Sequence, residues 1–190
     1  SYREDRDYGY LGWVSARRDL DRLPKEAPNN NNDRACTELS QAKNYLVLLN
    51  PEAFSSKESY IASLAASNYD LLIIDAYYGD SMLTPQDVAR LQYKPGGSRR
   101  LVASYMSVGE AEDYRPYWKP KWKTNPPDWM WIANGDWEGN YRVRYWSKDW
   151  QKMLMGSPQS YLDQILAAGF DGAFLDVIDV FYAFEDIANQ

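Results

Sequence analysis

Continuous apolar runs recur along the chain and predict strands that are buried on both faces. Four such runs are YLVLL, DLLIIDA, LVASYMSV and GAFLDVID, over 45–49, 70–76, 101–108 and 172–179. Uninterrupted runs of this length are typical of parallel sheets covered by helices on both sides. A fifth segment, YRVRYW over 141–146, alternates in polarity and predicts a short strand with one polar face.

Amphipathic segments lie between these runs and predict helices over 56–66, 83–92 and 157–169. Ser55 and Glu58 make a capping-box pattern before the first helix, and Thr84 and Asp87 make one before the second. Ser157 is expected to cap the third helix, and Gly169 to end it. Strands that alternate with helices at this spacing indicate βα units, so the predicted class is α/β.

The flanking segments set the expected domain organisation. Residues 1–40 carry charge runs and the tract APNNNND, which predicts an irregular N-terminal segment before a β/α domain over 41–190. Residues 109–140, rich in Trp, Tyr, Pro and Gly, predict a long loop. The mean hydropathy of -0.64 and the lack of a long apolar run argue against a membrane span.

Two absences restrict the chemistry. The chain has no histidine, which excludes a Ser-His-Asp triad and histidine-ligated zinc, and its one cysteine, Cys36, excludes an intrachain disulfide or a cysteine cluster. Carboxylates are well supplied, with 27 Asp and Glu residues. The net charge of -6 gives no basic face, so we expect no nucleic-acid partner.

The aromatic residues favour types with a polar group. The chain has 16 Tyr and 8 Trp residues but only 5 Phe residues. This bias predicts rings at a partly wet surface, where they match the flat faces and hydroxyl edges of sugars. The alternative is that some of these rings fill the core with their polar atoms hydrogen-bonded.

Three carboxylates follow or end the predicted strands. Asp75 closes the second run, Glu110 follows the third, and Asp176 closes the last one. Because active sites of (β/α)8 barrels lie at the C-terminal ends of the strands, we expect these side chains to converge. The alternatives are that Asp75 or Glu110 caps a following helix, and that Asp176 is a buried, paired carboxylate that fixes the barrel mouth.

Paired carboxylates across a cleft are what glycoside hydrolysis requires. One protonates the leaving oxygen, and the other attacks the anomeric carbon or activates water. The same three acids would also suit Mg²⁺ or Ca²⁺. The abundant Trp and Tyr residues favour the sugar, so we expect no metal and no cofactor.

Three longer blocks resemble glycoside-hydrolase family 114, the endo-α-1,4-polygalactosaminidases and their relatives. The blocks are YMSVGEAEDYRPYW, WEGNYRVRYWSKDWQ and AGFDGAFLDVIDVFYAFE, and with YDLLIIDA the match covers roughly 45–185. The resemblance implies a TIM-type (β/α)8 barrel, hydrolysis of an α-1,4-linked galactosamine-rich polysaccharide, and an acidic mouth with Asp75, Glu110 and Asp176. Family members are often exported, which implies an extracytoplasmic location.

We expect the blocks to supply the substrate-binding residues as well. Arg115 is expected to orient Glu110 or Glu112 through a bidentate bond. The side chains predicted to bind the sugar are Tyr105, Glu112, Arg115, Trp137, Tyr145, Trp146 and Asp179.

The barrel looks incomplete from the pattern alone. About five strands are predicted, whereas a closed barrel has eight and usually spans ~250 residues. We therefore expect the later strands to be missing through truncation or cleavage or to lie on another chain, or another molecule to cover the open edge of the sheet.

Three functional hypotheses remain open. The first is a glycosidase with Glu110 as general acid and with Asp176 or Asp75 as nucleophile or base. The second is a catalytically silent carbohydrate-binding or surface-scaffold protein that keeps the barrel and its aromatic mouth. The third is a metal-dependent hydrolase that uses the same acids.

Overall fold

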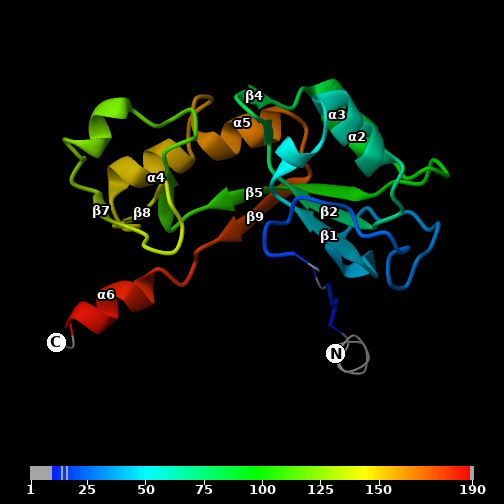
Figure 1. Ribbon diagram of the computed structural model, residues 1–190, viewed down its shortest axis with the longest axis horizontal. Helices are drawn as coiled ribbons and strands as arrows, with labels where there is room; N and C mark the ends of the chain where they lie inside the picture. The colour runs from blue at the N-terminus through cyan, green and yellow to red at the C-terminus, as the bar shows by residue number, and fades with distance from the viewer. Residues whose placement is uncertain (1–9, 14, 16, 189–190) are drawn as a thin grey trace. The chain divides into compact units, whose positions relative to one another are not determined.

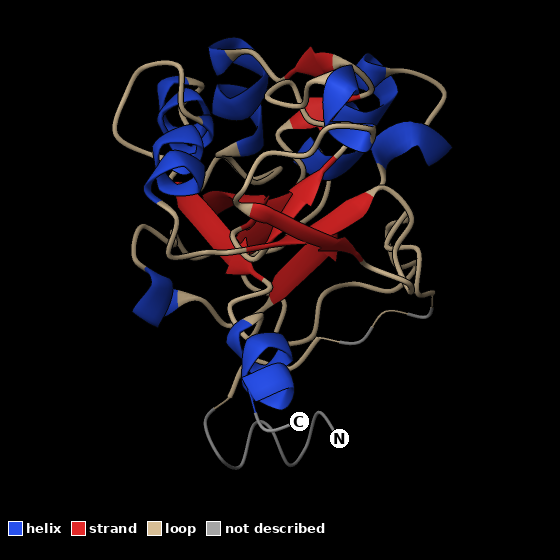
Figure 2. Cartoon of the chain, turned by 90° about the vertical axis from the view of Figure 1, so that its left-hand side faces the viewer, coloured by secondary structure: helices blue, strands red, loops and turns tan. Residues whose placement is uncertain are grey.

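The fold consists of two compact units in a computed structural model that describes residues 10–188 except 14 and 16 (Figure 1). The first unit takes its described residues from 10–105 and 165–174. The second unit comprises 106–164 and the described residues from 175 onwards. The described residues before 45 are irregular apart from η1 (Leu39–Gln41). Figure 2 shows the helices and strands joined by irregular chain.

A four-stranded sheet with the order β1-β2-β5-β9 organises the fold. Its strands are β1 (Tyr45–Leu48), β2 (Leu71–Ile74), β5 (Leu101–Ser107) and β9 (Gly172–Asp176). β2 pairs in parallel with β1 and with β5, and all four β2 residues are buried. The apolar runs therefore predicted an α/β fold with a parallel sheet correctly, while the described residues form no closed barrel.

Two helices of the first unit, α2 (Lys57–Ala65) and α3 (Pro85–Leu91), contact each other. The predicted capping box of α3 is confirmed, because Thr84 and Asp87 each accept a hydrogen bond from the other's backbone N–H. The predicted capping box of α2 is wrong by one residue, because Ser56 rather than Ser55 accepts from the N–H of Ser59. Short elements complete this unit: η2 (Pro51–Ala53), β3 (Tyr77–Tyr78) and β4 (Ser81–Met82).

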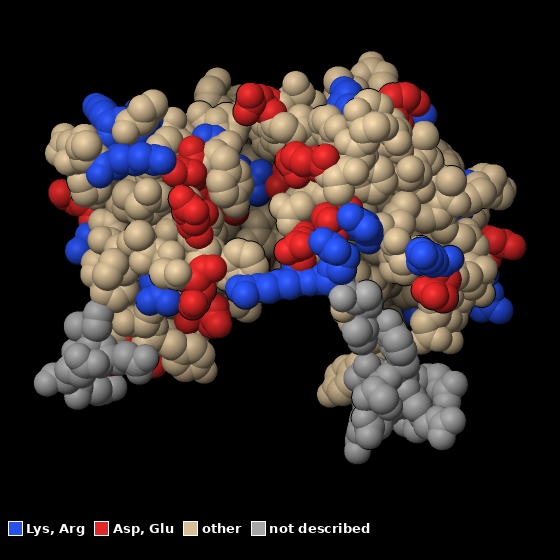
Figure 3. Space-filling model, in the orientation of Figure 1, with Lys and Arg blue, Asp and Glu red and all other residues tan. Residues whose placement is uncertain are grey.

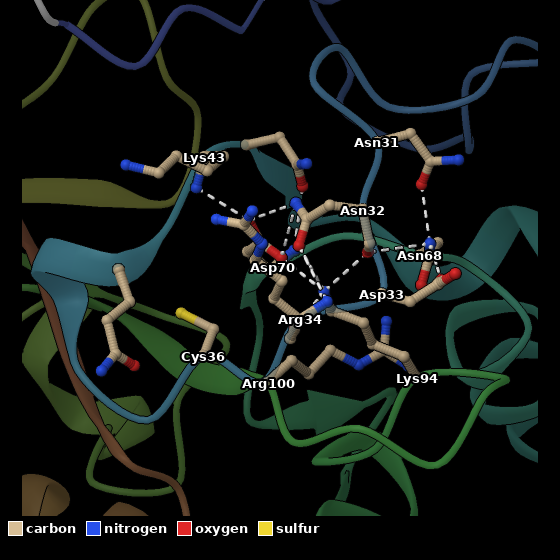
Figure 4. A network of polar contacts seen from close by, with 12 residues as sticks. Asn31, Asn32, Asp33, Arg34, Cys36, Lys43, Asn68, Asp70, Lys94 and Arg100 are labelled. Atoms are coloured by element: carbon tan, nitrogen blue, oxygen red, sulfur yellow. Dashed lines mark hydrogen bonds and ion pairs between the residues drawn. The ribbon is translucent and has the colours of Figure 1, made fainter.

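A buried ion pair joins the irregular segment before β1 to the sheet (Figure 4). Lys94 Nζ lies 2.5 Å from Asp70 Oδ1, and the two side chains are 0% and 2% exposed. The ammonium group also donates to the carbonyl oxygens of Asn32 and Arg34, at 3.0 and 2.9 Å. Asp70 in turn accepts from the backbone N–H of Lys43 at 2.7 Å. Every charge in this network is thus compensated, as burial requires.

The second unit contains an antiparallel sheet that the sequence pattern did not predict. Strand β8 (Asn140–Val143) lies between β6 (Glu110–Glu112) and β7 (Met130–Ala133) and pairs antiparallel with both. The expected loop over 109–140 therefore contains β6, η3 (Pro120–Lys123), β7 and the first residue of β8, joined by irregular chain. The strand predicted over 141–146 belongs to this sheet and not to the parallel one.

The later elements also differ from the pattern. Helix α4 (Lys148–Leu154) was not predicted, and α5 (Tyr161–Ala167) begins later than the expected helix over 157–169. The end of α5 is as predicted, because Gly169 has a φ of +92°. Strand β9 was expected to be buried but is half-exposed, with Phe174 43% and Leu175 49% accessible. Helix α6 (Phe181–Ala188) was likewise not predicted.

The core of the second unit is a chain of indole rings. Trp122 lies 5.4 Å from Trp118 and 5.1 Å from Trp129, and Trp129 lies 5.0 Å from Trp150, between ring centroids. Trp150 is fully buried and donates its indole N–H to the carbonyl oxygen of Val108 at 2.9 Å. The alternative that some rings fill the core with their polar atoms hydrogen-bonded is correct for Trp150, and Trp122 and Trp129 are buried as well.

Candidate active site

The candidate site begins at the corner where β5 ends. Val108 N–H donates to the carbonyl oxygen of Asp176 at 3.0 Å, and Val143 N–H donates to that of Gly109 at 3.1 Å. A Cβ atom added to Gly109 would lie 2.7 Å from Val180 Cβ and nearer still to the carbonyl oxygen of Val177. Only glycine fits this approach, which brings the end of β9 alongside the residue before Glu110.

Glu110 lies at the start of β6 and is 3% exposed, so its expected position on a loop beyond the strand is wrong. Its two carboxylate oxygens each accept a side-chain amide N–H, from Asn134 at 2.7 Å and from Asn140 at 3.0 Å. Among the described residues, no lysine or arginine pairs with it. Within the described ranges, Glu110 is therefore a carboxylate that two side-chain amides hold in place, with no cation beside it to balance its charge.

The orientation of Asn134 is fixed from its other side. Its Oδ1 accepts the backbone N–H of Asp136 at 2.9 Å, so its Nδ2 must point toward Glu110. Sequence reasoning did not single out either asparagine. Asn140 stands in a block that resembles the family, which was a usable signal, whereas Asn134 comes to Glu110 only through the pairing of β7 and β8.

Glu112 and Arg115 form a buried ion pair beside this corner. Arg115 Nε lies 2.7 Å from Glu112 Oε2, and the side chains are 3% and 1% exposed. The hydroxyl of Tyr114 donates to Glu112 Oε1 at 2.6 Å, and the backbone N–H of Glu112 donates to the hydroxyl of Tyr117 at 3.1 Å. Burial raises the pKa of Tyr117 well above its ordinary value. Arg115 thus contacts Glu112, one of the two carboxylates that it was expected to orient; the bidentate form of the bond, and direct contact of either residue with a sugar, stay predictions.

Asp176 differs from Glu110 in its surroundings. It ends β9, is half-buried, and its carboxylate has no hydrogen-bond or ion-pair partner among the residues that the structure describes. The next residue, Val177, has a φ of +57°, a conformation that is costly for a β-branched side chain. Backbone strain of this kind is concentrated at functional sites. Among the described residues, Asp176 has neither the burial nor the partner that the alternative of a buried, paired carboxylate requires.

Two predicted site residues belong to the first unit. Asp75 follows β2, is 8% exposed, and accepts the backbone N–H of Tyr77 at 2.8 Å. That bond closes the turn into β3, so the helix cap considered for Asp75 is wrong. Tyr105 is half-buried in β5. A catalytic role for Asp75 and a binding role for Tyr105 stay predictions.

The remaining predicted binding residues lie exposed in the second unit. Tyr145 and Trp146 follow β8 with 41% and 51% of their surface accessible, and their ring centroids are 5.0 Å apart. Trp137, in the turn between β7 and β8, is 52% exposed. Asp179 is exposed between β9 and α6. Binding of substrate by these four residues stays a prediction.

Charges of both signs are interspersed on the face of the molecule shown in Figure 3. Within the described ranges, no group of three or more Asp, Glu or Cys side chains is arranged to hold a metal ion. Nor do those ranges contain a helix that is long and apolar enough to cross a membrane.

The fold and the site define an α/β protein with carboxylates at the carboxyl ends of its parallel strands, where β/α enzymes carry their active sites. The particular family follows from the sequence. The profile of glycoside-hydrolase family GH114 matches residues 38–190, and the chain belongs to that family. The resemblance found in the three sequence blocks is thereby confirmed.

Relatives of known sequence include uncharacterized proteins of Methanocaldococcus jannaschii, Deinococcus radiodurans and Thermotoga maritima. A protein of Methanocaldococcus jannaschii is 36% identical over 163 residues, which is 84% of this chain and 44% of that protein. A protein of Thermotoga maritima is 35% identical over 124 residues, 62% of this chain and 35% of that protein. The chain spans less than half the length of the curated relatives it matches.

Two solved structures are similar at a lower level. Ega3 of Aspergillus fumigatus in complex with galactosamine is 22% identical, with a TM-score of 0.48 over 73% of this chain and 45% of that chain. The glycoside hydrolase domain of PelA from Pseudomonas aeruginosa is 19% identical, with a TM-score of 0.46 over 73% of this chain and 46% of that chain.

Proposed function

We propose that this protein is a glycoside hydrolase that cleaves an α-1,4-linked, galactosamine-rich polysaccharide by carboxylate acid/base chemistry. Membership of GH114 over residues 38–190 supports the reaction class. The observation that carries the site is Asp176, a half-buried carboxylate without a partner among the described residues, next to the strained Val177. The substrate rests on the family resemblance.

The reaction requires two carboxyl groups with different tasks. One gives its proton to the glycosidic oxygen while the bond from that oxygen to the anomeric carbon breaks. The other attacks the anomeric carbon, or takes a proton from the water that does so. We assign direct contact with the reacting atoms to Asp176, because its carboxylate is accessible and is not engaged by other side chains in the described structure.

Within the second unit, Glu110 is the candidate for the other carboxyl group of the reaction. Its surroundings change the role that we assign to it. The general-acid role rested on a loop position that Glu110 does not have. Its burial and its two hydrogen bonds from side-chain amides instead favour a carboxylate that is held in place. It acts when the substrate takes over the amide hydrogen bond of Asn134 or Asn140. In the sequence-based hypothesis, Asp75 is the alternative to Asp176 as nucleophile or base.

The acidic balance of the chain suits the proposed polymer. A partly de-acetylated galactosamine polysaccharide carries ammonium groups, and a protein with a net charge of -6 attracts such a polymer. The exposed Asp179 lies three residues after Asp176 and offers a second carboxylate for pairing with an amine. The family resemblance also implies an extracytoplasmic location for the protein.

The test is release of reducing ends from an α-1,4-linked galactosamine polymer by the full-length protein and its variants. Asp176→Asn removes the reacting carboxylate and is expected to lower the rate by about 10²–10⁴-fold. Asp149→Asn is the matched control, because that side chain is 77% exposed and carries only a surface ion pair. Equal rates for wild-type protein and Asp176→Asn would refute the assignment.

The same assay separates the other two hypotheses. Polymer binding without reducing-end release by the wild-type protein would identify a carbohydrate-binding scaffold. Loss of release on addition of a chelator, with restoration by Mg²⁺ or Ca²⁺, would identify a metal-dependent hydrolase.

A further inference from the structure

A cluster of rings on the second unit is separate from its indole core. Phe184 of α6 lies 4.5 Å from Trp131 of β7 and 4.8 Å from Trp146, between ring centroids. Tyr145 completes the group at 6.3 Å from Phe184. We call Trp131, Tyr145 and Trp146 the ring platform.

Core packing does not explain the ring platform. Tyr145 and Trp146 remain 41% and 51% exposed although Phe184 contacts them. By contrast Trp150, in the indole core of the same unit, is fully buried. Large rings held together at an exposed surface mark a place where a ligand or partner binds.

The geometry of the contact indicates what the platform accepts. The planes of Phe184 and Trp131 are inclined by only 31°, so one flat six-membered ring lies over the face of the indole. Trp146 meets the same ring edge-on at 72°. A pyranose ring has similar breadth and presents polarised C–H groups to the electron-rich face of an indole.

We propose that the ring platform is a stacking subsite for one pyranose ring of a polysaccharide, and that α6 covers it with Phe184 until the substrate displaces the helix. The proposal rests on the proposed function for the identity of the ligand. The proposal adds two features to the proposed function: a sugar subsite that includes Trp131, and a helix, α6, that competes with the sugar for this subsite.

The segment between β9 and α6 contains a strained residue that favours this movement. Val177, whose φ is +57°, joins β9 to the turn that leads into α6, where Val180 N–H donates to the Val177 carbonyl oxygen at 3.3 Å. Departure of α6 would let Val177 return to an ordinary backbone conformation, so relief of strain assists the opening. Occupation of the platform is thereby coupled to the residue that follows Asp176.

Two measurements on the full-length protein test the proposal. The first is quenching of tryptophan fluorescence by acrylamide without sugar, which is expected to rise in Phe184→Ala because Trp131 and Trp146 lose their cover. The second is the affinity for an α-1,4-linked galactosamine oligosaccharide, measured in the Asp176→Asn background to prevent hydrolysis. Phe184→Ala is expected to bind about two- to tenfold more tightly, the worth of one or two ring contacts, and Trp131→Ala more weakly.

Tyr182→Ala is the matched control, because Tyr182 is on the same helix, 59% exposed, with its ring against Phe181. It is expected to change neither measurement. If Phe184→Ala does not fold, Phe184→Leu, which keeps an apolar contact but no flat ring, is expected to shift both measurements in the same direction by less.

Unchanged quenching in Phe184→Ala would contradict the claim that Phe184 covers the ring platform. Greater quenching without tighter binding of the oligosaccharide would contradict the claim that the platform is a sugar subsite. Failure of the proposed function has a different signature: the oligosaccharide would bind to the platform, and tighter in Phe184→Ala, while the wild-type protein releases no reducing ends.

Discussion

Glycine at position 109 is required by close approach rather than by an unusual backbone angle. The backbone of Val177 and the side chain of Val180 occupy the space that a Cβ atom would need. The residue thereby fixes how near β9 comes to the corner that carries Glu110. Its role is steric and local, and its effect reaches both candidate carboxylates of this unit.

We predict that Gly109→Ala lowers the stability by about 1–3 kcal/mol, because the backbone of Val177 must move to accommodate the methyl group. Thermal unfolding measures the change. Gly135→Ala is the control, since a Cβ atom there would meet nothing within 4 Å. Similar melting temperatures for the two variants would contradict the close approach.

Arg100 connects two helices of the first unit at their C-terminal ends. Its fully buried guanidinium donates to the carbonyl oxygens of Leu91, the last residue of α3, and of Tyr93, at 2.6 and 2.7 Å. It also donates to those of Leu64 and Ser67, at 3.2 and 2.8 Å, at the end of α2. Burial lowers the pKa of Arg100 to about 10, which still leaves it charged at neutral pH. A cation at two helix C-termini is favoured by both helix dipoles.

We predict that Arg100→Lys costs at least about 2 kcal/mol of stability although it preserves the charge. A lysine ammonium has three donors and no planar fork, so buried carbonyl oxygens of α2 or α3 lose their partners. Urea denaturation gives the free energy of unfolding. Arg22→Lys, at a side chain that is 66% exposed, is expected to leave it unchanged. A loss no larger than in that control would show that charge alone is what the site needs.

At the scale of elements, the sequence predicted the parallel strands well because apolar runs are strong signals. The antiparallel sheet was not predicted because its strand β6 has the sequence Glu-Ala-Glu. Both carboxylates are buried, whereas a strand with two charged residues would be expected to expose them. The late start of α5 was not predicted because Ser157 and Pro158 have the sequence pattern of a helix start. In the structure, the first helical residue is Tyr161, which follows Ser160. The positions of Asp75 and Asp176 at the ends of strands of the parallel sheet were predictable. The amides that hold Glu110 depend on strand pairing and were not.

The Asp70–Lys94 network lies at the amino ends of the parallel strands of the first unit. The network joins segments far apart in the sequence, from Asn32 to Lys94, so it forms only when the whole unit is folded. Cys36 lies beside it, 1% exposed, and its backbone N–H donates to the carbonyl oxygen of Arg99 at 2.8 Å. Burial, and then the charge of Asp70, raise the pKa of the Cys36 thiol.

We predict that Cys36 is protected from iodoacetamide in the folded protein and that Lys94→Met speeds its alkylation at least about tenfold. Removal of Lys94 leaves Asp70 as an unpaired buried charge, which costs about 3–5 kcal/mol and favours opening of the segment. Mass spectrometry of the single-cysteine chain follows the reaction. Lys25→Met, at an exposed side chain, should react at the wild-type rate. An unaltered rate in Lys94→Met would show that the network does not hold the segment.

The chain of four indoles in the second unit has an optical consequence. Centroid separations of 5.0 to 5.4 Å bring the electronic transitions of Trp118, Trp122, Trp129 and Trp150 into strong coupling. Coupled indoles produce paired bands of circular dichroism in the far ultraviolet, where helices are usually quantified. A spectrum of this protein would therefore understate or overstate its helix content. The same bands offer a label-free signal that reports the folding of the second unit alone.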